Sequence, residues 1–223
     1  MTILKQFPEL QVGIFGKSRQ RQSDAECAKD LGFSQVASLN QVHGNTTYIV
    51  EGPTDGSLEG DGLITATPGL ALSVRWADCQ AFVIYAPLRR SSGQAPKQVI
   101  GVLHAGWRGM ALKAITAHFR QLQAHFGIEP SETYIGAAPS LCLKCAEFSD
   151  PQRELPEHLH PFIQGRTVDL QAAADAELDT LGVPRSQRER HPACTRCGEG
   201  FWSWRRDKVP DARNYLVAGI RMS

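Results

Sequence analysis

Short apolar runs in the middle of the chain predict buried β-strands. Each run is rich in β-branched side chains, and its length suits a strand better than a helix. A Pro-Gly turn separates the first two runs, and a further apolar run lies close to the C-terminus. The predicted strands cover Gly62–Ala66, Leu70–Val74, Ala81–Tyr85, Val99–Leu103 and Tyr215–Ile220.

Helical patterns flank these strands. Apolar residues recur at helical spacing over Met110–Phe126, which predicts a helix, and Gly127 marks the end of this helix. A Ser-x-x-Glu capping box opens a short helix over Ser23–Leu31. A third helix is predicted over Leu170–Leu181, between a capping aspartate and a glycine. Strands and helices do not alternate regularly, which predicts an α+β fold with mixed sheets.

Two stretches without periodicity, 87–97 and 150–161, are rich in proline, serine or charge and predict excursions at the surface. Neither is long enough to be a linker between domains. The chain has 223 residues, enough for one buried core and short for two ordinary domains. We therefore expect residues 1–223 to form a single domain.

Composition narrows the classes of function. The formal net charge is +1, so the chain lacks the excess of basic residues that is typical of proteins that bind nucleic acid or an anionic membrane. No apolar run approaches the ~18 residues of a membrane span, and the first ten residues do not form a signal peptide. These features predict a cytoplasmic protein. In that compartment the six cysteines are more typical of metal ligands, nucleophiles or core residues than of disulfides.

Three short segments place a metal-capable residue at the boundary of a predicted element. His43 lies in a loop between asparagines, Cys79 lies between two predicted strands, and His104 lies where a strand turns into a helix. Two imidazoles and one thiolate form a three-ligand zinc site with an open fourth position. The alternative is a hydrogen-bonded loop histidine and a buried core thiol.

Residues beside these candidates suggest further chemistry. Gly106 and Gly109 allow close backbone approach at a helix start, and Arg108 offers a fork of donors, a combination that favours an oxyanion or phosphate. A tight turn is the alternative explanation. Asp78 is a candidate general base or a carboxylate that orients a ligand imidazole, although a turn carboxylate is the commoner case.

Two CxxC pairs form a second signal. Two such pairs commonly hold a structural zinc, which predicts a site at Cys142, Cys145, Cys194 and Cys197. Four unrelated thiols are the alternative. The segment Trp202–Asp207 is aromatic and basic, which fits either a wall against the substrate or an apolar strand with a charged end.

Together these segments resemble the laccase-domain family, also described as the multicopper polyphenol oxidase-like or purine nucleoside phosphorylase family. Their order and rough spacing match the family from about residue 38 to the C-terminus, and the segment His104–Gly109 is the most specific. The matching segments are Cys194-Thr195, Phe201–Asp207, Gln41–Gly44, Asp61–Thr65, Ala77–Cys79 and His104–Gly109.

This resemblance implies an α/β/β/α layered sandwich and a zinc held by His43, Cys79 and His104. It implies a purine nucleoside phosphorylase whose small-molecule partners are a nucleoside and phosphate. Phosphate attacks the ribose carbon of adenosine, inosine, guanosine or methylthioadenosine and releases the base, and adenosine can also be deaminated. Arg108 would hold the phosphate, and zinc-activated water would attack the purine for deamination.

Two other enzyme classes stay open. Cys79 could act as a nucleophile with His104 as its base and cleave an amide, without a metal. Some members of the family have been discussed as editors of peptidoglycan precursors. A copper-dependent polyphenol oxidase is the third class, because one cysteine and two histidines can bind copper. The remaining five histidines do not supply the short-spaced motifs of a multicopper site.

Overall fold

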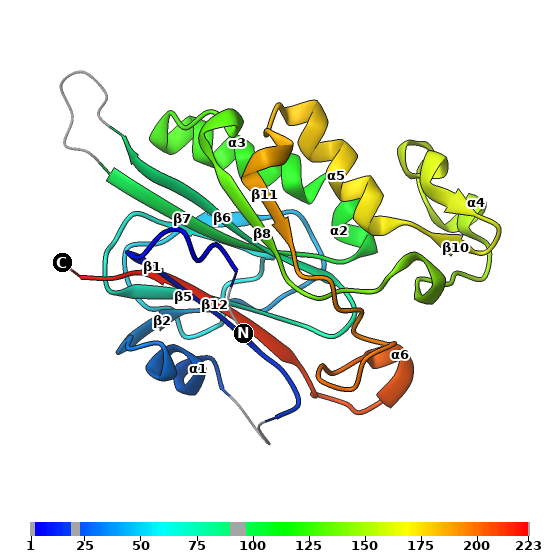
Figure 1. Cartoon of the computed structure of the whole chain (residues 1–223), viewed down its shortest axis with the longest axis horizontal. Helices are drawn as coiled ribbons and strands as arrows, with labels where there is room; N and C mark the ends of the chain where they lie inside the picture. Colours follow the sequence, from blue (N-terminus) through cyan, green and yellow to red (C-terminus); the bar gives the residue numbers. More distant parts are fainter. Residues whose placement is uncertain (1–2, 19–22, 90–96, 223) are drawn as a thin grey trace.

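The computed structural model describes residues 3–18, 23–89 and 97–222, and its two larger β-sheets pack face to face (Figure 1). Each sheet combines parallel and antiparallel pairs, which confirms the α+β fold with mixed sheets. The four-stranded sheet has the order β1 (Leu10–Phe15), β12 (Asn214–Ile220), β5 (Leu70–Trp76), β2 (Gln35–Ala37). The six-stranded sheet has the order β11 (Arg188–Arg190), β8 (Tyr134–Ala137), β6 (Gln80–Arg89), β7 (Lys97–Ala105), β4 (Gly62–Thr65), β3 (Thr47–Ile49).

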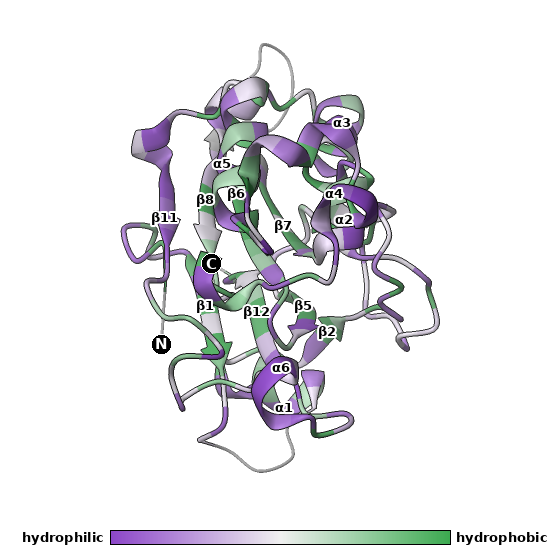
Figure 2. Cartoon of the chain, turned by 90° about the vertical axis from the view of Figure 1, so that its right-hand side faces the viewer, coloured by the Kyte–Doolittle hydropathy of each residue, from purple (hydrophilic) through white to green (hydrophobic). Residues whose placement is uncertain are grey.

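Helices cover the outer face of each sheet (Figure 1). Helix α1 (Asp24–Asp30) lies against the four-stranded sheet, and α3 (Ala114–Phe126) and α5 (Leu170–Leu181) lie against the six-stranded sheet. This arrangement confirms the expected α/β/β/α layers. Hydrophobic residues gather in the strands between the helical layers (Figure 2). No helix in the described part of the chain is long and apolar enough to cross a membrane.

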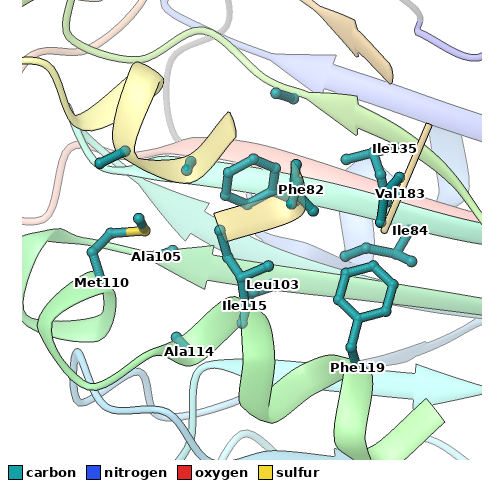
Figure 3. Close-up of a cluster of buried hydrophobic side chains, with 14 of the residues drawn as sticks. Phe82, Ile84, Leu103, Ala105, Met110, Ala114, Ile115, Phe119, Ile135 and Val183 are labelled. Atoms are coloured by element: carbon teal, nitrogen blue, oxygen red, sulfur yellow. The ribbon is translucent and has the colours of Figure 1, made fainter. Parts of the chain in front are cut away.

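Strand β6 explains why the apolar runs are continuous. Its residues alternate between two hydrophobic clusters, so both faces of the strand are buried. Phe82 and Ile84 pack with Leu103 and Phe119 on the helix side (Figure 3). Val83 faces the other sheet. Strand β6 therefore lies between the two main hydrophobic clusters of the described chain.

The predicted helix over Met110–Phe126 is wrong at its start. The chain forms α2 (Trp107–Ala111), breaks at Lys113 with a left-handed φ of 59°, and continues as α3. Leu112, which fits the predicted apolar stripe, is exposed at the end of α2. The capping box of α1 and both ends of α5 are confirmed.

The predicted surface excursion over 150–161 is also wrong in part. This segment forms α4 (Pro151–Glu154) and a 3-10 turn, η3 (Glu157–Phe162), and its leucines Leu155 and Leu159 are buried in the helix-side core. Of the other predicted excursion, 87–97, the ends belong to strands, because β6 reaches Arg89 and β7 begins at Lys97. Residues 90–96, where the rest of this prediction falls, lie outside the described residues. The remaining elements are η1 (Pro130–Glu132), η2 (Leu143–Cys145), β9 (Ile163–Gln164), β10 (Thr167–Val168), η4 (Arg185–Gln187) and α6 (Trp204–Asp207).

Candidate metal centre and its pocket

His43, Cys79 and His104 meet at one end of the six-stranded sheet, with their ligand atoms all within 4.8 Å of one another. Cys79 directly precedes β6 and His104 lies near the end of β7. These strands pair antiparallel with Ala81 opposite His104, and this register brings Cys79 close to His104. The rings of His43 and His104 meet edge to face at 4.9 Å between centroids. Their predicted role as metal ligands stays a prediction, and their geometry allows it.

A buried carboxylate, that of Asp61, supports this group from behind. Its Oδ1 lies 2.7 Å from His104 Nδ1, and its two oxygens accept the backbone N–H groups of His43 at 3.1 Å and Gly44 at 2.6 Å. His43 has a left-handed φ of 60°, which turns both amides toward the carboxylate. Pairing at Nδ1 leaves His104 Nε2 as the ligand atom. Burial raises the pKa of Asp61, and these hydrogen bonds outweigh burial and lower it.

Sequence reasoning gave Asp61 no role. The available signal was an aspartate at the head of a predicted strand, inside one of the segments that carry the family resemblance. Its function depends on the backbone pairing of β4 with β7 and on the turn at His43, neither of which a sequence pattern displays.

The thiol and the imidazole at the centre shift each other's ionisation. Burial raises the pKa of Cys79, but the charge and hydrogen bonds of His104 and His43 outweigh burial and lower the pKa to about 6. Burial lowers the pKa of His104, but the Cys79 thiolate and Asp61 outweigh burial and raise the pKa to about 9. A metal ion that binds here replaces the imidazolium proton.

The two glycines that flank Trp107 and Arg108 make room for the His43 loop. A Cβ at Gly106 would lie 2.9 Å from Cys79 Sγ, and a Cβ at Gly109 would lie 3.0 Å from the carbonyl oxygen of Gly44. Close approach at these positions therefore serves the packing of the centre. The helix that follows, α2, has only five residues, so an anion here would depend on the Arg108 side chain. That guanidinium lies over the Trp107 ring, 4.4 Å from its centroid.

A pocket of about 870 Å³ opens beside the centre. This volume lies in the range of small-molecule sites. Helices α2 and α6 both lie toward the right-hand side of the molecule in Figure 1. Besides the candidate ligands, the lining includes aromatic and cationic side chains, namely Trp76, Trp107, Phe148, Trp204, Tyr215, Arg75, Arg108, Arg205 and Arg213.

The aromatic and basic segment Trp202–Asp207 supplies part of this lining. It forms the short helix α6, capped by Ser203, and not the apolar strand that was one alternative. Trp204 and Arg205 line the pocket, and Trp204 is half exposed. The geometry agrees with the other alternative, a wall against a substrate.

Asp78 lines the pocket, but its carboxylate is engaged elsewhere. Oδ1 accepts a hydrogen bond from the Thr195 hydroxyl at 2.8 Å, and Oδ2 accepts one from the backbone N–H of Arg205 at 2.8 Å. The orientation of His104, one of the roles considered for Asp78, comes from Asp61 instead. Asp78 has a left-handed φ of 89°, which fits a turn carboxylate.

The two CxxC pairs also come together. The thiols of Cys142, Cys145, Cys194 and Cys197 all lie within 4.8 Å of one another, and we call this group the cysteine cluster. Burial raises the pKa of Cys194, but backbone N–H donors outweigh burial and lower the pKa to about 7. Four convergent thiols form a possible metal site, and the alternative of four unrelated thiols does not hold.

The donor set at the centre fits a borderline-soft ion. Zinc accepts imidazole nitrogen and thiolate together, and three protein ligands leave a position open toward the pocket. Fold and site thus define a layered α+β protein with a candidate three-ligand metal centre. Comparison with known proteins gives the family: residues 17–221 match the model described as multi-copper polyphenol oxidoreductase laccase, and the chain belongs to this family. The resemblance found in the sequence is confirmed.

Curated relatives carry the names of enzymes. A purine nucleoside phosphorylase of Streptomyces coelicolor is 31% identical over 192 residues, covering 82% of this chain and 75% of the relative. A purine nucleoside phosphorylase of Deinococcus radiodurans is 31% identical over 206 residues, covering 88% and 75%. A protein named adenosine deaminase RL5, from an unknown prokaryotic organism, is 27% identical over 173 residues, covering 72% and 63%. These names support an enzyme of this family.

Solved structures share the fold. YlmD of Geobacillus stearothermophilus matches with a TM-score of 0.79 and 26% identity, covering 98% of this chain and 94% of that chain. The hypothetical protein YfiH of Bacillus licheniformis matches with a TM-score of 0.74 and 24% identity, covering 87% and 78%, a likeness of fold alone.

Proposed function

We propose that the protein is a zinc-dependent purine nucleoside phosphorylase that can also deaminate adenosine. The observation that carries the proposal is the convergence of His43, Cys79 and His104 beside a pocket with aromatic and arginine side chains. The names of the relatives support the substrate class. The proposal also includes a nucleoside and phosphate as partners, no nucleic acid or membrane partner, and a cytoplasmic location.

In phosphorolysis a phosphate oxygen forms a bond to the ribose carbon, the bond from that carbon to the purine nitrogen breaks, and the base leaves with a proton. Arg108 would bind the phosphate, since a guanidinium pairs with an oxyanion through two donors. The rings of Trp107 and Trp204 would hold the purine. Asp61 would keep His104 oriented. Bound zinc supplies a Lewis acid that lowers the pKa of water toward ~7.

A general-base role for Asp78 is not part of this proposal. Both of its carboxylate oxygens already accept hydrogen bonds, from Thr195 and from the backbone of Arg205. These contacts and the left-handed φ fit a carboxylate that holds the local turn.

Incubation of the purified protein with adenosine and phosphate tests the proposal, with separation of adenine, inosine and ribose-1-phosphate. We expect adenine or inosine to form, and His104→Ala to abolish the product. His125→Ala is the matched control, because His125 is exposed on α3 and is not among the residues that line the pocket. Equal turnover by His104→Ala and the parent protein would refute the site.

A second candidate is an amide hydrolase with Cys79 as nucleophile and His104 as its base. The neighbouring thiolate and imidazolium favour it, because that pairing is typical of a reactive cysteine. Iodoacetamide inactivation that persists after complete removal of metal would select it over the phosphorylase. Oxygen uptake with a phenol and copper would instead select a polyphenol oxidase, the class in the family's description.

Zinc is also the ion that we propose for the cysteine cluster. Four thiolates form a closed tetrahedral set of the structural type, with no position left open for a substrate.

A further inference from the structure

The geometry of the cysteine cluster suits one shared ion. The sulfurs of Cys142 and Cys197 lie 3.9 Å apart, and those of Cys145 and Cys197 lie 3.3 Å apart. Zinc–sulfur bonds of about 2.3 Å in a tetrahedron place thiolates about 3.8 Å apart. The backbone N–H of Cys142 also points at Cys194 Sγ at 3.3 Å. A small adjustment of these side chains would therefore complete a tetrahedral site.

The loops that carry the four thiols have a small apolar core of their own. The apolar cluster around them consists of Leu141, Cys145 and Ala146, with two further cysteines at its edge. A single β-bridge joins Ser140 to Cys194. Loops with so small a core commonly depend on a structural metal.

Both loops hold the residue that precedes Cys79. From the first loop, the Leu141 N–H donates to the Asp78 carbonyl oxygen at 3.2 Å. From the second loop, the Thr195 hydroxyl donates to the Asp78 carboxylate at 2.8 Å, and Thr195 is fully buried. A left-handed φ at a residue other than glycine persists only where its surroundings hold it. The conformation of Asp78, and with it the direction of Cys79, therefore depends on these two loops and on α6, whose Arg205 N–H donates to the same carboxylate at 2.8 Å.

The second loop is also tied to the pocket lining. The Arg206 guanidinium donates to the carbonyl oxygens of Thr195 at 2.8 Å and Arg196 at 2.9 Å, and also to that of Gly198. Arg206 belongs to α6, which carries Trp204 into the pocket. Movement of the 194–198 loop would therefore also move one side of the pocket.

We propose that a zinc ion in the cysteine cluster fixes Asp78 through Leu141 and Thr195, and thereby sets the position of Cys79 at the catalytic centre. Asp78 and Thr195 are positioning residues in this arrangement. The inference rests on the proposed function only for the zinc at the centre, and the cluster itself is tested separately.

Native mass spectrometry of the zinc-loaded protein tests the two sites. The parent is expected to hold one zinc at each site, Cys197→Ser only that of the centre, and Cys79→Ser only that of the cluster. Cys27→Ala is the control and is expected to keep both ions, because Cys27 is a buried residue of α1, outside both sites. An unchanged zinc count in Cys197→Ser overturns the cluster. An unchanged count in Cys79→Ser refutes only the proposed centre.

The coupling is tested by a matched pair at Thr195. Thr195→Val keeps the shape but loses the hydroxyl, and Thr195→Ser keeps the hydroxyl. We expect Thr195→Val to retain the cluster zinc while its centre binds zinc about tenfold more weakly, the lower end of the effect of removing a supporting hydrogen bond. Thr195→Ser is expected to bind as the parent does.

Equal affinity in Thr195→Val and the parent, or equal loss in both Thr195 variants, overturns the coupling. If the centre proves to hold no zinc, the rate at which iodoacetamide alkylates Cys79 gives the same test. A loosened turn exposes the thiol, so alkylation is then expected to be faster in Thr195→Val than in Thr195→Ser. Equal rates would overturn the inference in that case.

Discussion

At the scale of single residues, the Asp61 carboxylate holds two of the three candidate ligands. Asp61→Asn keeps the shape but turns one acceptor oxygen into a donor, so a donor from His104 or from the His43 loop loses its partner. We expect the zinc affinity of the centre to fall about 10- to 100-fold, as measured by competition with a chelating dye.

Asp55→Asn is the control for this substitution, because Asp55 is an exposed loop carboxylate that accepts hydrogen bonds from Ser57 and is not part of the centre. Its zinc affinity is expected to match that of the parent. If Asp61→Asn also binds zinc as tightly as the parent, the carboxylate does not support the centre.

The buried side chain of His118 predicts that the free energy of unfolding depends on pH in the acid range. Its ring lies against Gly62 and Gly101, where added Cβ atoms would come within 3.0 and 2.4 Å of its nitrogens, and burial lowers its pKa to about 3. Among the described residues, its Nε2 has no hydrogen-bond partner. The unfolded chain protonates this side chain near pH 6.5, so between that pH and about 3 the unfolded state binds the extra proton. The free energy of unfolding therefore falls as the pH falls through this window.

Urea unfolding of the parent and of His118→Gln at about pH 7 and about pH 5 measures this effect. Between these conditions the parent is expected to lose about 2 kcal/mol more stability than the variant. His125→Gln removes an exposed histidine and should leave the parent's pH dependence unchanged. Identical pH dependence in the parent and His118→Gln would show that His118 is not neutral when buried.

The candidate ligands themselves could be predicted from the sequence, because imidazole and thiolate are recognisable by residue type. The residues that position these ligands could not be predicted from the sequence. Asp61 acts through a strand register and a left-handed turn, and Asp78 is held by Thr195, more than a hundred residues away along the chain. Such partners become visible only once the backbone is placed.

At the scale of elements, helix α5 depends on its cap. Asp169 accepts the Ala172 N–H at 2.9 Å, which satisfies a donor that has no partner within the helix. Asp169→Ala is expected to lower the free energy of unfolding by about 1 kcal/mol, and Asp169→Asn by a smaller amount because it keeps an acceptor. Chemical denaturation measures both. Equal stability of the alanine and asparagine variants would contradict the capping role.

Helix α3 shows where a periodic pattern fails. Leu112, Ile115 and Phe119 have helical spacing, which predicts one continuous helix, but Leu112 is exposed while Ile115 and Phe119 face the core. The chain nevertheless breaks at Lys113, whose residue type has no preference for the left-handed conformation it adopts. Packing of α2 beside the candidate centre overrides the local preference. The helix over 170–181, with both ends marked by an aspartate and a glycine, could be predicted fully.

At the scale of the whole molecule, bound zinc is expected to stabilise the fold. The unfolded chain does not present the assembled ligands, and an ion at about 100 times its dissociation constant contributes about 2.7 kcal/mol per site. A chelator should lower the midpoint of thermal unfolding, and added zinc should restore it. The zinc-dependent rise should be smaller in Cys197→Ser. A midpoint that does not respond to chelation would argue against both sites.

Only part of the layered arrangement could be predicted from the pattern of apolar residues. Apolar runs such as Ala81–Tyr85 predict buried strands but not which strands pair, and the short pairing of β11 with β8 has no local signal. The packing of the two sheets was implied by the family resemblance and not by periodicity. Non-local pairing of this kind depends on the whole chain, and short patterns carry little of it.

The antiparallel pairing of β6 with β7 has a consequence for the order of assembly. Closing a short loop loses less chain entropy than closing a long one, so this strand pair can form early and place Cys79 and His104 together. His43 lies further away along the chain and reaches the others only when its own loop docks on Asp61. We therefore expect Cys79 and His104 to form a two-ligand site early in folding, and His43 to become the third ligand last.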